Sequence, residues 1–348
     1  MIVSTTLVGN NVDIVADALR SVVDWVDLCL VIDTGSTDGT LEVARSIAGA
    51  KYVERKFPWI NDFAAARNFA LAVATELGAN WAITVDTDER IMPNGEDLRS
   101  VLRNCTEGVV MMSDSERTYA KERCFRLPSP SRFDGPTHEV FPSHDAAFFT
   151  FVSALFHELP KSPGGYRAKF ERDAEILITH SAAHPHDPRW HYYLGDAFQS
   201  LGRLPEAIAA YDACALLWGW DEESAWACYR SAECLLTLGR HREALDRCAG
   251  GLARHAGVAE LAWLAAVVTY DLGNAPQAVY WARLAITHGL FRGDGACVPR
   301  IGFRNRNALF EGPFDILRFA LRALGDTAGA DAAERAYHEA IAARESTG

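Results

Sequence analysis

The sequence lacks the features of several common protein classes. Its eight cysteines are scattered without a CxxC pair, which gives no indication of a zinc knuckle or a redox dithiol. Its longest apolar runs, such as AAFFTFVSALF, fall far short of the roughly 20 residues that cross a bilayer. Basic residues are outnumbered, 34 against 46 acidic, and the net charge of −12 disfavours nucleic acid or anionic lipid as a partner. We therefore expect a cytoplasmic protein with reduced thiols, no transmembrane segment and no nucleic-acid partner.

The 348 residues are enough for two domains, and the two halves of the chain differ in periodicity. In the first half, β-rich runs (IVSTTLV, LCLVID, WAITVD, GVVMMS) alternate with helical patterns such as DFAAARNFALAVATEL. That order is typical of a mostly parallel sheet with helices on its faces. The second half has almost no strand character and is rich in Ala, Leu, Trp and Tyr at helical spacing.

The second half also repeats itself. The segments LGRLPEA, LGRHREA and LGNAPQA start at residues 201, 238 and 272, 37 and then 34 residues apart, and a weaker copy, LGDTAGA, starts at 324. Period and pattern resemble the tetratricopeptide repeat, whose stacked helix pairs form a concave surface. We expect that surface to contact a peptide or protein, with a purely stabilising role as the alternative. Residues 288–313 depart from the repeat, and a loop that folds back on the first domain and a solvated linker both remain open.

Three acidic residues lie within four positions of the run ANWAITVDTDERIMP, directly after its apolar part. They are Asp86, Asp88 and Glu89. Like charges this close repel each other unless a cation, a helix N-terminus or water compensates. A metal site and a solvated strand end are both consistent with this stretch alone.

The run VIDTGSTDGT lies where a strand should end and a helix begin. Asp33 leaves the strand, Gly35 and Gly39 permit tight turns, and the polar residues between them can cap the next helix. An acid at the carboxyl edge of a parallel strand is well placed to bind a ribose or a base. A capped turn without a ligand is the alternative.

Taken together, VIDTGSTDGT and FPWINDFAAARNFALAVATELGANWAITVDTDE resemble glycosyltransferase family 2, and specifically its bacterial branch with C-terminal tetratricopeptide repeats. The resemblance extends from Met1 to about Ile286. It implies an α/β GT-A (Rossmann-like) nucleotide-sugar domain at residues 1–160, followed by an all-α tetratricopeptide-like domain at residues 161–348. The implied activity is inverting sugar transfer from a nucleotide-sugar, with UDP expected before dTDP or GDP. The implied acceptor is a peptide, a natural product or a glycan, and the repeats would present it or form a homodimer.

The resemblance also assigns residues to the donor site. The DTD segment corresponds to the family's DxD motif, which holds Mg²⁺ or Mn²⁺ against the diphosphate. Asp88 is the first expected metal ligand, Asp86 would reach the ribose or the metal through water, and His157 is a candidate third ligand, with a core histidine as the alternative. The other expected nucleotide-sugar contacts are Thr6, Val8, Asp33 and Arg67.

The segment RFDGPTHEVF resembles the family's Gly-x-x-His-Glu segment. It implies Glu139 as the catalytic base and His138 as the residue that orients it or contacts the acceptor. A turn-capping His138 and a solvated Glu139 are the structural alternatives. Arg67 is expected to reach the base or the phosphates, because its guanidinium fork matches phosphate oxygens, and an exposed helix arginine is its alternative.

Two other functions compete with sugar transfer. A catalytically silent nucleotide-sensing scaffold for protein–protein interaction would have no need of Asp86, Asp88 and Glu139. Nucleotidyl transfer would call for a basic Gly-rich loop near the N-terminus, where TTLVGNNVDIV has neither lysine nor arginine. The presence of these three acids and the absence of a basic loop both favour the glycosyltransferase.

Overall fold

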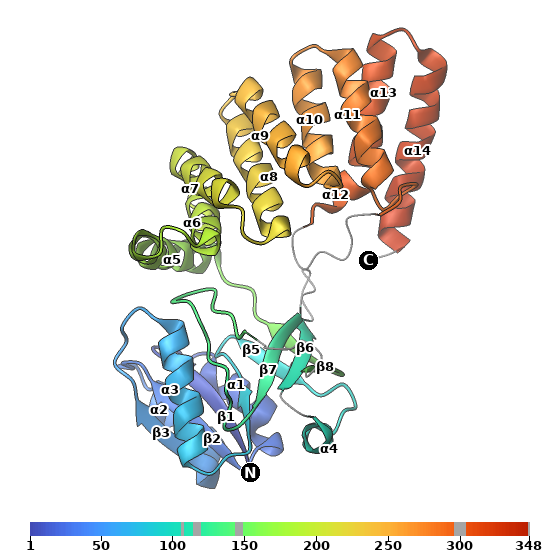
Figure 1. The fold of residues 1–348 in the computed structure, drawn as a ribbon. Coiled ribbons are helices and arrows are strands. Elements are labelled where there is room, and N and C mark those ends of the chain that lie inside the picture. The colour runs from blue at the N-terminus through green and yellow to red at the C-terminus, as the bar shows by residue number, and fades with distance from the viewer. Residues whose placement is uncertain (106–107, 114–119, 143–148, 296–303, 347–348) are drawn as a thin grey trace. The chain divides into compact units, whose positions relative to one another are not determined.

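A computed structural model of the chain describes residues 1–105, 108–113, 120–142, 149–295 and 304–346. The chain divides into two compact units, Met1–Pro163 (the first unit) and Gly164–Gly348 (the second unit). Figure 1 shows a sheet with helices in the first and helices alone in the second.

The first unit is built on one mixed sheet in the order β3-β2-β1-β4-β7-β6-β8-β5. Neighbouring strands from β3 to β4 run parallel, β7 is antiparallel to both β4 and β6, β8 is parallel to β6, and β5 is antiparallel to β8. The strands are β1 Ile2–Val8, β2 Leu28–Asp33, β3 Tyr52–Lys56, β4 Trp81–Thr84, β5 Glu89–Met92, β6 Gly108–Ser113, β7 Ala120–Arg126 and β8 Phe149–Glu158.

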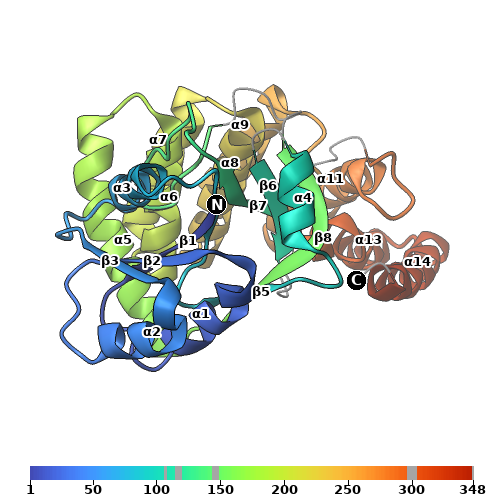
Figure 2. The same ribbon diagram turned by 90° about the horizontal axis from the view of Figure 1, so that it is seen from below.

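Helices cover both faces of the parallel part of this sheet. The helices are α1 Val15–Val22, α2 Thr40–Ala48, α3 Phe63–Glu76 and α4 Leu98–Asn104, with short 3₁₀ turns at Val23–Trp25 and Gly49–Lys51. On β2, Val31 packs in one cluster with residues of α1 and α2, whereas Leu30 and Ile32 pack in another with residues of α3. Successive side chains of a strand point to opposite faces, so α3 lies on one face and α1 and α2 on the other. Figure 2 shows this layering.

The expected α/β sheet is confirmed, but its antiparallel part was not foreseen. The strands β5 and β7 read ERIM and AKERCFR, so charged residues interrupt the apolar run that predicts a strand. β5 pairs with β8 and β7 pairs with β4, both antiparallel, and these pairings supply backbone hydrogen bonds whatever the amino-acid composition of the strands.

The second unit consists of successive helix pairs, which confirms the expected repeats. Four pairs turn at Gly202, Gly239, Gly273 and Gly325, whose φ values of +75°, +72°, +73° and +81° favour glycine. These glycines belong to the LG dipeptides of the repeated segments, so each copy marks one interhelical turn. The helices are α5 Pro163–Ala183, α6 Pro188–Ser200, α7 Leu204–Leu217, α8 Asp221–Thr237, α9 His241–Arg254, α10 Ala259–Asp271, α11 Ala275–His288, α12 Arg306–Leu309, α13 Gly312–Ala323 and α14 Thr327–Ser346.

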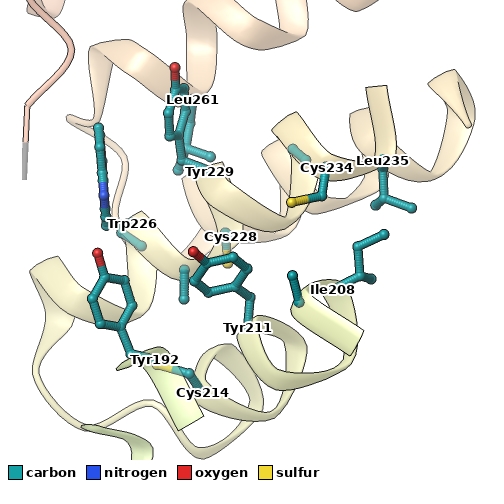
Figure 3. Packing of buried hydrophobic residues seen from close by; sticks show 14 of the residues in the cluster. Tyr192, Ile208, Tyr211, Cys214, Trp226, Cys228, Tyr229, Cys234, Leu235 and Leu261 are labelled. Carbon is teal, nitrogen blue, oxygen red and sulfur yellow. The ribbon is translucent and has the colours of Figure 1, made fainter. Parts of the chain in front are cut away.

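Aromatic and small residues share the core of the second unit (Figure 3). Trp226 and Tyr229 stack with ring centroids 4.6 Å apart, and Tyr211 is fully buried. A Cβ atom on Gly195 would lie 2.6 Å from the Tyr211 ring, so glycine is what lets α6 approach α7 this closely.

The remaining expectations for the chain concern its thiols, the segment 288–313 and the membrane. The seven described cysteines are free and buried, as expected, while Cys297 lies outside the described residues. Residues 306–309 of the departing segment form α12, and residues 296–303 are not described. No helix in the described ranges has the length and apolar character needed to cross a membrane.

Candidate active site

The ends of three parallel strands define one edge of the sheet. Val8 at the end of β1 is in register with Asp33 at the end of β2, and Thr5 is in register with Thr84 on β4. Because carboxyl ends of parallel strands meet at one edge, Asp33 and the DTD segment after β4 both emerge there. Ligands of open α/β sheets bind at this kind of edge.

Arg67 on α3 lies at the centre of the site. Its two terminal nitrogens each contact one carboxylate oxygen of Asp86 at 2.9 Å, and its Nε donates to Glu139 Oε1 at 2.5 Å. The Arg67 side chain is 8% exposed, so it is not the exposed helix arginine that the sequence left open. Burial alone would lower the pKa of Arg67, but the two carboxylates outweigh it and raise that pKa. Arg67 thus joins the candidate base to the DTD segment.

Glu139 is a buried but ionised carboxylate. Burial acts to raise its pKa, yet the Arg67 guanidinium outweighs this effect and the pKa is lowered. Its side chain is 11% exposed, in contrast to the solvated glutamate that was the alternative. The preceding residue, His138, has φ of +50°, a left-handed conformation that is uncommon outside glycine. The backbone at His138 therefore turns sharply just before the candidate base.

Asp86 is likewise held in its charged form. Burial acts to raise its pKa, but Arg67, followed by Lys121 and Arg123, outweighs burial and lowers it. The backbone N–H of Glu89 donates to the Asp86 carbonyl at 2.9 Å, while the Asp86 N–H donates to Glu89 Oε2 at 3.2 Å. The tight turn between β4 and β5 and the neighbouring cationic side chains therefore fix the positions of the acids in this segment.

A second ion pair that the sequence did not predict supports this turn. Glu89 on β5 pairs with Arg123 on β7, and both side chains are nearly inaccessible to solvent. Burial raises the pKa of Glu89 in spite of Arg123. Lys121 Nζ lies 3.9 Å from Glu89 and 4.0 Å from Asp86. The signal for Lys121 and Arg123 was their alternation in AKERCFR, which puts both on one face of β7.

Asp88 lies at the more open side of the turn. Its carboxylate, whose side chain is 27% exposed, pairs with Lys161, and its carbonyl accepts from the Leu159 N–H at 2.8 Å. These contacts bring the end of β8 beside the DTD segment, where His157 is in register with Arg90 of β5. Sequence reasoning missed Lys161. Within the described part of the chain, no three His, Cys, Asp or Glu side chains gather as a metal-binding group, so Asp86, Asp88 and His157 do not converge here.

The three nucleotide contacts expected from the first two strands lie at the carboxyl edge, and two of them are engaged with protein groups. The Val8 carbonyl accepts from the N–H and the hydroxyl of Thr34, both at 2.8 Å. Asp33 Oδ1 accepts from the N–H groups of Gly35 at 3.0 Å and Ser36 at 2.7 Å. Burial opposes ionisation of Asp33, but these donors outweigh it and lower its pKa. Thr6 Oγ1 is buried and has no hydrogen-bond partner among the described residues.

Known proteins resemble this chain in part. A TPR repeat-containing protein of Synechococcus elongatus is 36% identical over 142 residues, which are 38% of this chain and 34% of that protein. The glycosyltransferase SunS of Bacillus subtilis is 26% identical over 216 residues, 58% of this chain and 50% of that protein. An uncharacterized glycosyltransferase of Rickettsia typhi is 28% identical over 158 residues, 44% and 49% of the two chains. The chain thus spans about half the length of these relatives or less.

The solved structures that match the chain include one of low TM-score and low sequence identity. The crystal structure of the MamA protein has a TM-score of 0.39 at 16% identity, covering 50% of this chain and 83% of MamA. The model of the family described as glycosyl transferase family 2, in contrast, matches residues 7–157, the part that holds the DTD segment, Arg67 and Glu139. Residues 7–157 therefore form a glycosyltransferase family 2 domain within this chain.

Proposed function

We propose that the chain is a metal-dependent inverting glycosyltransferase that moves a sugar from a nucleotide-sugar, UDP-linked in the first instance, to a peptide, natural-product or glycan acceptor. One observation carries the proposal: Arg67 holds the ionised Glu139 and the DxD residue Asp86 together at the carboxyl edge of a family 2 sheet. A silent scaffold has no need of a buried carboxylate kept charged at that place.

The donor would bind along the edge formed by β1, β2 and β4. Asp33 is the proposed contact to the base, and the two backbone hydrogen bonds of its turn both end on its Oδ1. Thr6 and Val8 would line the same side of the nucleotide. Arg67 would act on the phosphates indirectly, by holding Asp86 in place, because its own nitrogens already contact Asp86 and Glu139.

Asp88 fits the role of a metal-holding carboxylate. It already pairs with one cation, Lys161, on the open side of the turn, and a single carboxylate together with diphosphate oxygens suits a hard divalent ion. A bound Mg²⁺ or Mn²⁺ would neutralise charge that develops on the leaving diphosphate. Asp86 would act through Arg67 and the ribose, since both its carboxylate oxygens face the guanidinium.

Glu139 would take the proton of the attacking acceptor group. Its lowered pKa keeps the carboxylate free to accept a proton at neutral pH, and the transfer is helped as the acceptor becomes more acidic during bond formation. The proton ends on a Glu139 oxygen, the new glycosidic bond forms at the anomeric carbon, and the nucleoside diphosphate leaves. His138, next to Glu139, is the proposed orienter or acceptor contact.

The helix pairs of the second unit are the proposed contact surface for the acceptor, with a homodimer interface as the other use of that surface. Stacked helix pairs of this kind commonly present a surface to a partner, which supports an interaction role for this part. A cytoplasmic location is also part of the proposal and rests on the composition.

A calorimetric titration with UDP, dTDP and GDP, each with and without Mn²⁺, tests the donor site. We expect UDP to bind most tightly and its affinity to rise with Mn²⁺. The same preparation is then incubated with UDP-glucose, and release of UDP to water as acceptor is measured. Nucleotide binding without release of the corresponding nucleoside diphosphate, from this donor or from a panel of other UDP-, dTDP- and GDP-sugars, would favour the nucleotide-sensing scaffold.

A further inference from the structure

The loop that carries Glu139 is attached to α3 by two neighbouring residues. Arg67 holds Glu139 itself, as described above, and Asn68 holds the start of the loop at Phe133. The Asn68 Nδ2 group donates to the Phe133 carbonyl at 2.9 Å, and the Phe133 N–H donates to Asn68 Oδ1 at 2.8 Å. An amide side chain donates through its NH₂ group and accepts through its carbonyl oxygen, whereas an ionised aspartate only accepts and leucine does neither.

Backbone and ring contacts close the rest of the loop. The N–H and carbonyl of Asp134 pair with those of Val140, both hydrogen bonds being 2.9 Å. The rings of Phe133 and Phe141 lie 5.1 Å apart, and both pack on Phe125 of β7. The loop is thus pinned at its two ends.

The segment between these ends is short and sharply turned. Gly135 and His138 have φ values of +100° and +50°, and the Pro136 carbonyl accepts from the N–H of Phe63 at the start of α3 at 2.8 Å. The direction in which Glu139 leaves the backbone is therefore set by how the loop is seated on α3. A loss of the Phe133 contact would change that direction, although Asn68 does not contact Glu139 in the structure.

We propose that Asn68 is a positioning residue for Glu139: it fixes the loop 133–141 on α3 so that the carboxylate meets Arg67 and the acceptor. This inference rests on the proposed function, in which Glu139 is the base. Catalytic groups displaced by about 1 Å lose on the order of 100-fold in rate, so a small shift of the loop is sufficient for a measurable effect.

The test uses the full chain with Asn68→Asp and Asn68→Leu, which keep the approximate size of asparagine. The matched controls are Asn104→Asp and Asn104→Leu on α4, where the amide makes a single exposed contact to the Ser100 carbonyl at 3.4 Å. Circular dichroism checks folding. Hydrogen exchange at the Val140 amide reports the seating of the loop, and UDP release from UDP-glucose with Mn²⁺ gives kcat and the donor KM.

We expect the Asn68 variants to exchange the Val140 amide faster and to lose roughly 10- to 100-fold in kcat, with donor KM and UDP affinity changed less than about twofold. The Asn104 variants should match the wild type in all four quantities. The positioning role would be overturned if the Val140 amide exchanged at the wild-type rate, or if it exchanged faster while kcat stayed unchanged. It would also be overturned if the donor KM rose and kcat did not fall. A wild-type protein that releases no nucleoside diphosphate from UDP-glucose or from any other sugar donor of the panel would overturn the proposed function and this inference together, so the two failures are distinguished.

Discussion

Arg67 and Asp86 form a bidentate pair, with Nη1 facing Oδ1 and Nη2 facing Oδ2, each at 2.9 Å. This geometry uses both carboxylate oxygens of Asp86 and both terminal nitrogens of Arg67, as in the strongest arginine–carboxylate pairs. The first acid of the DTD segment thus orients an arginine, whereas the second, Asp88, is the one to which the proposed function assigns a metal ion.

Replacement of Asp88 by asparagine should remove the effect of Mn²⁺ on UDP binding. The variant loses the one carboxylate charge that would hold the ion, so we expect the gain in UDP affinity on adding Mn²⁺ to fall by roughly tenfold or more. Calorimetric titration with and without Mn²⁺ measures it. Asp17→Asn, at an exposed ion pair on α1, is the control. A Mn²⁺ effect of wild-type size in Asp88→Asn would remove Asp88 from the metal site.

Lys161 should compete with the metal for Asp88, since its ammonium group pairs with that carboxylate. Lys161→Met keeps the aliphatic stem and removes the charge, so we expect tighter Mn²⁺ binding in the absence of nucleotide. Titration with Mn²⁺ alone compares the Mn²⁺ affinity of the variant with that of the wild type. The control is Lys51→Met, at a lysine that contacts the Val23 carbonyl. Weaker Mn²⁺ binding in Lys161→Met would show that the lysine supports the site instead.

Glutamine at position 139 should abolish turnover and spare donor binding. It can still accept the hydrogen bond from Arg67 but takes no proton at neutral pH, and loss of a general base typically costs ~10² in rate or more. UDP release and UDP affinity are measured in parallel, with Glu76→Gln at an exposed position of α3 as the control. Normal turnover in Glu139→Gln would assign the base elsewhere.

The second unit should lose stability as the pH rises from about 5 to 7 through Glu223 on α8. Burial raises the pKa of Glu223 to about 7 from its ordinary 4.5, although Arg189 lies 3.7 Å away. Between these values the unfolded chain releases the proton and the folded chain keeps it, so unfolding becomes easier as pH rises; above about 7 both states are ionised. The loss amounts to roughly 3 kcal/mol at most.

Glu223→Gln should therefore flatten this pH dependence. Urea unfolding followed by helical circular dichroism at pH 5 and pH 8 compares the variant with the wild type and with Glu175→Gln, an exposed change on α5. A pH dependence equal to that of the wild type would assign it to other groups.

Two glycine-to-alanine changes in the helix pairs should change the free energy of unfolding in opposite directions. In Gly195→Ala the new methyl group meets the buried Tyr211 ring, and such overpacking costs about 1–3 kcal/mol. In Gly250→Ala on α9 the methyl group meets open space, so the better helix propensity should raise stability by roughly 0.5–1 kcal/mol. Urea midpoints measure both; a stabilised Gly195→Ala would mean that α6 and α7 separate at low cost.

Local patterns in the sequence determined much of this architecture. The LG segments repeat because the turn between the two helices of each pair needs a residue with left-handed backbone conformation, and that requirement recurs at Gly202, Gly239 and Gly273. The early strands and α3 follow from their apolar periodicity, which neighbouring residues alone create. The acids of the DTD segment and the His-Glu pair were visible for the same reason, since each lies within a few residues of chain.

The tertiary structure decided which of these groups meet. Arg67 reaches Asp86 and Glu139 across 19 and 72 residues, and Lys161 reaches Asp88 across 73, separations at which no sequence period carries information. These pairs form because α3 packs on β1 and β2, and because β8 returns beside β5. A buried charge is stable only with a partner, and the pairing of strands and helices far apart in the chain supplies the partner.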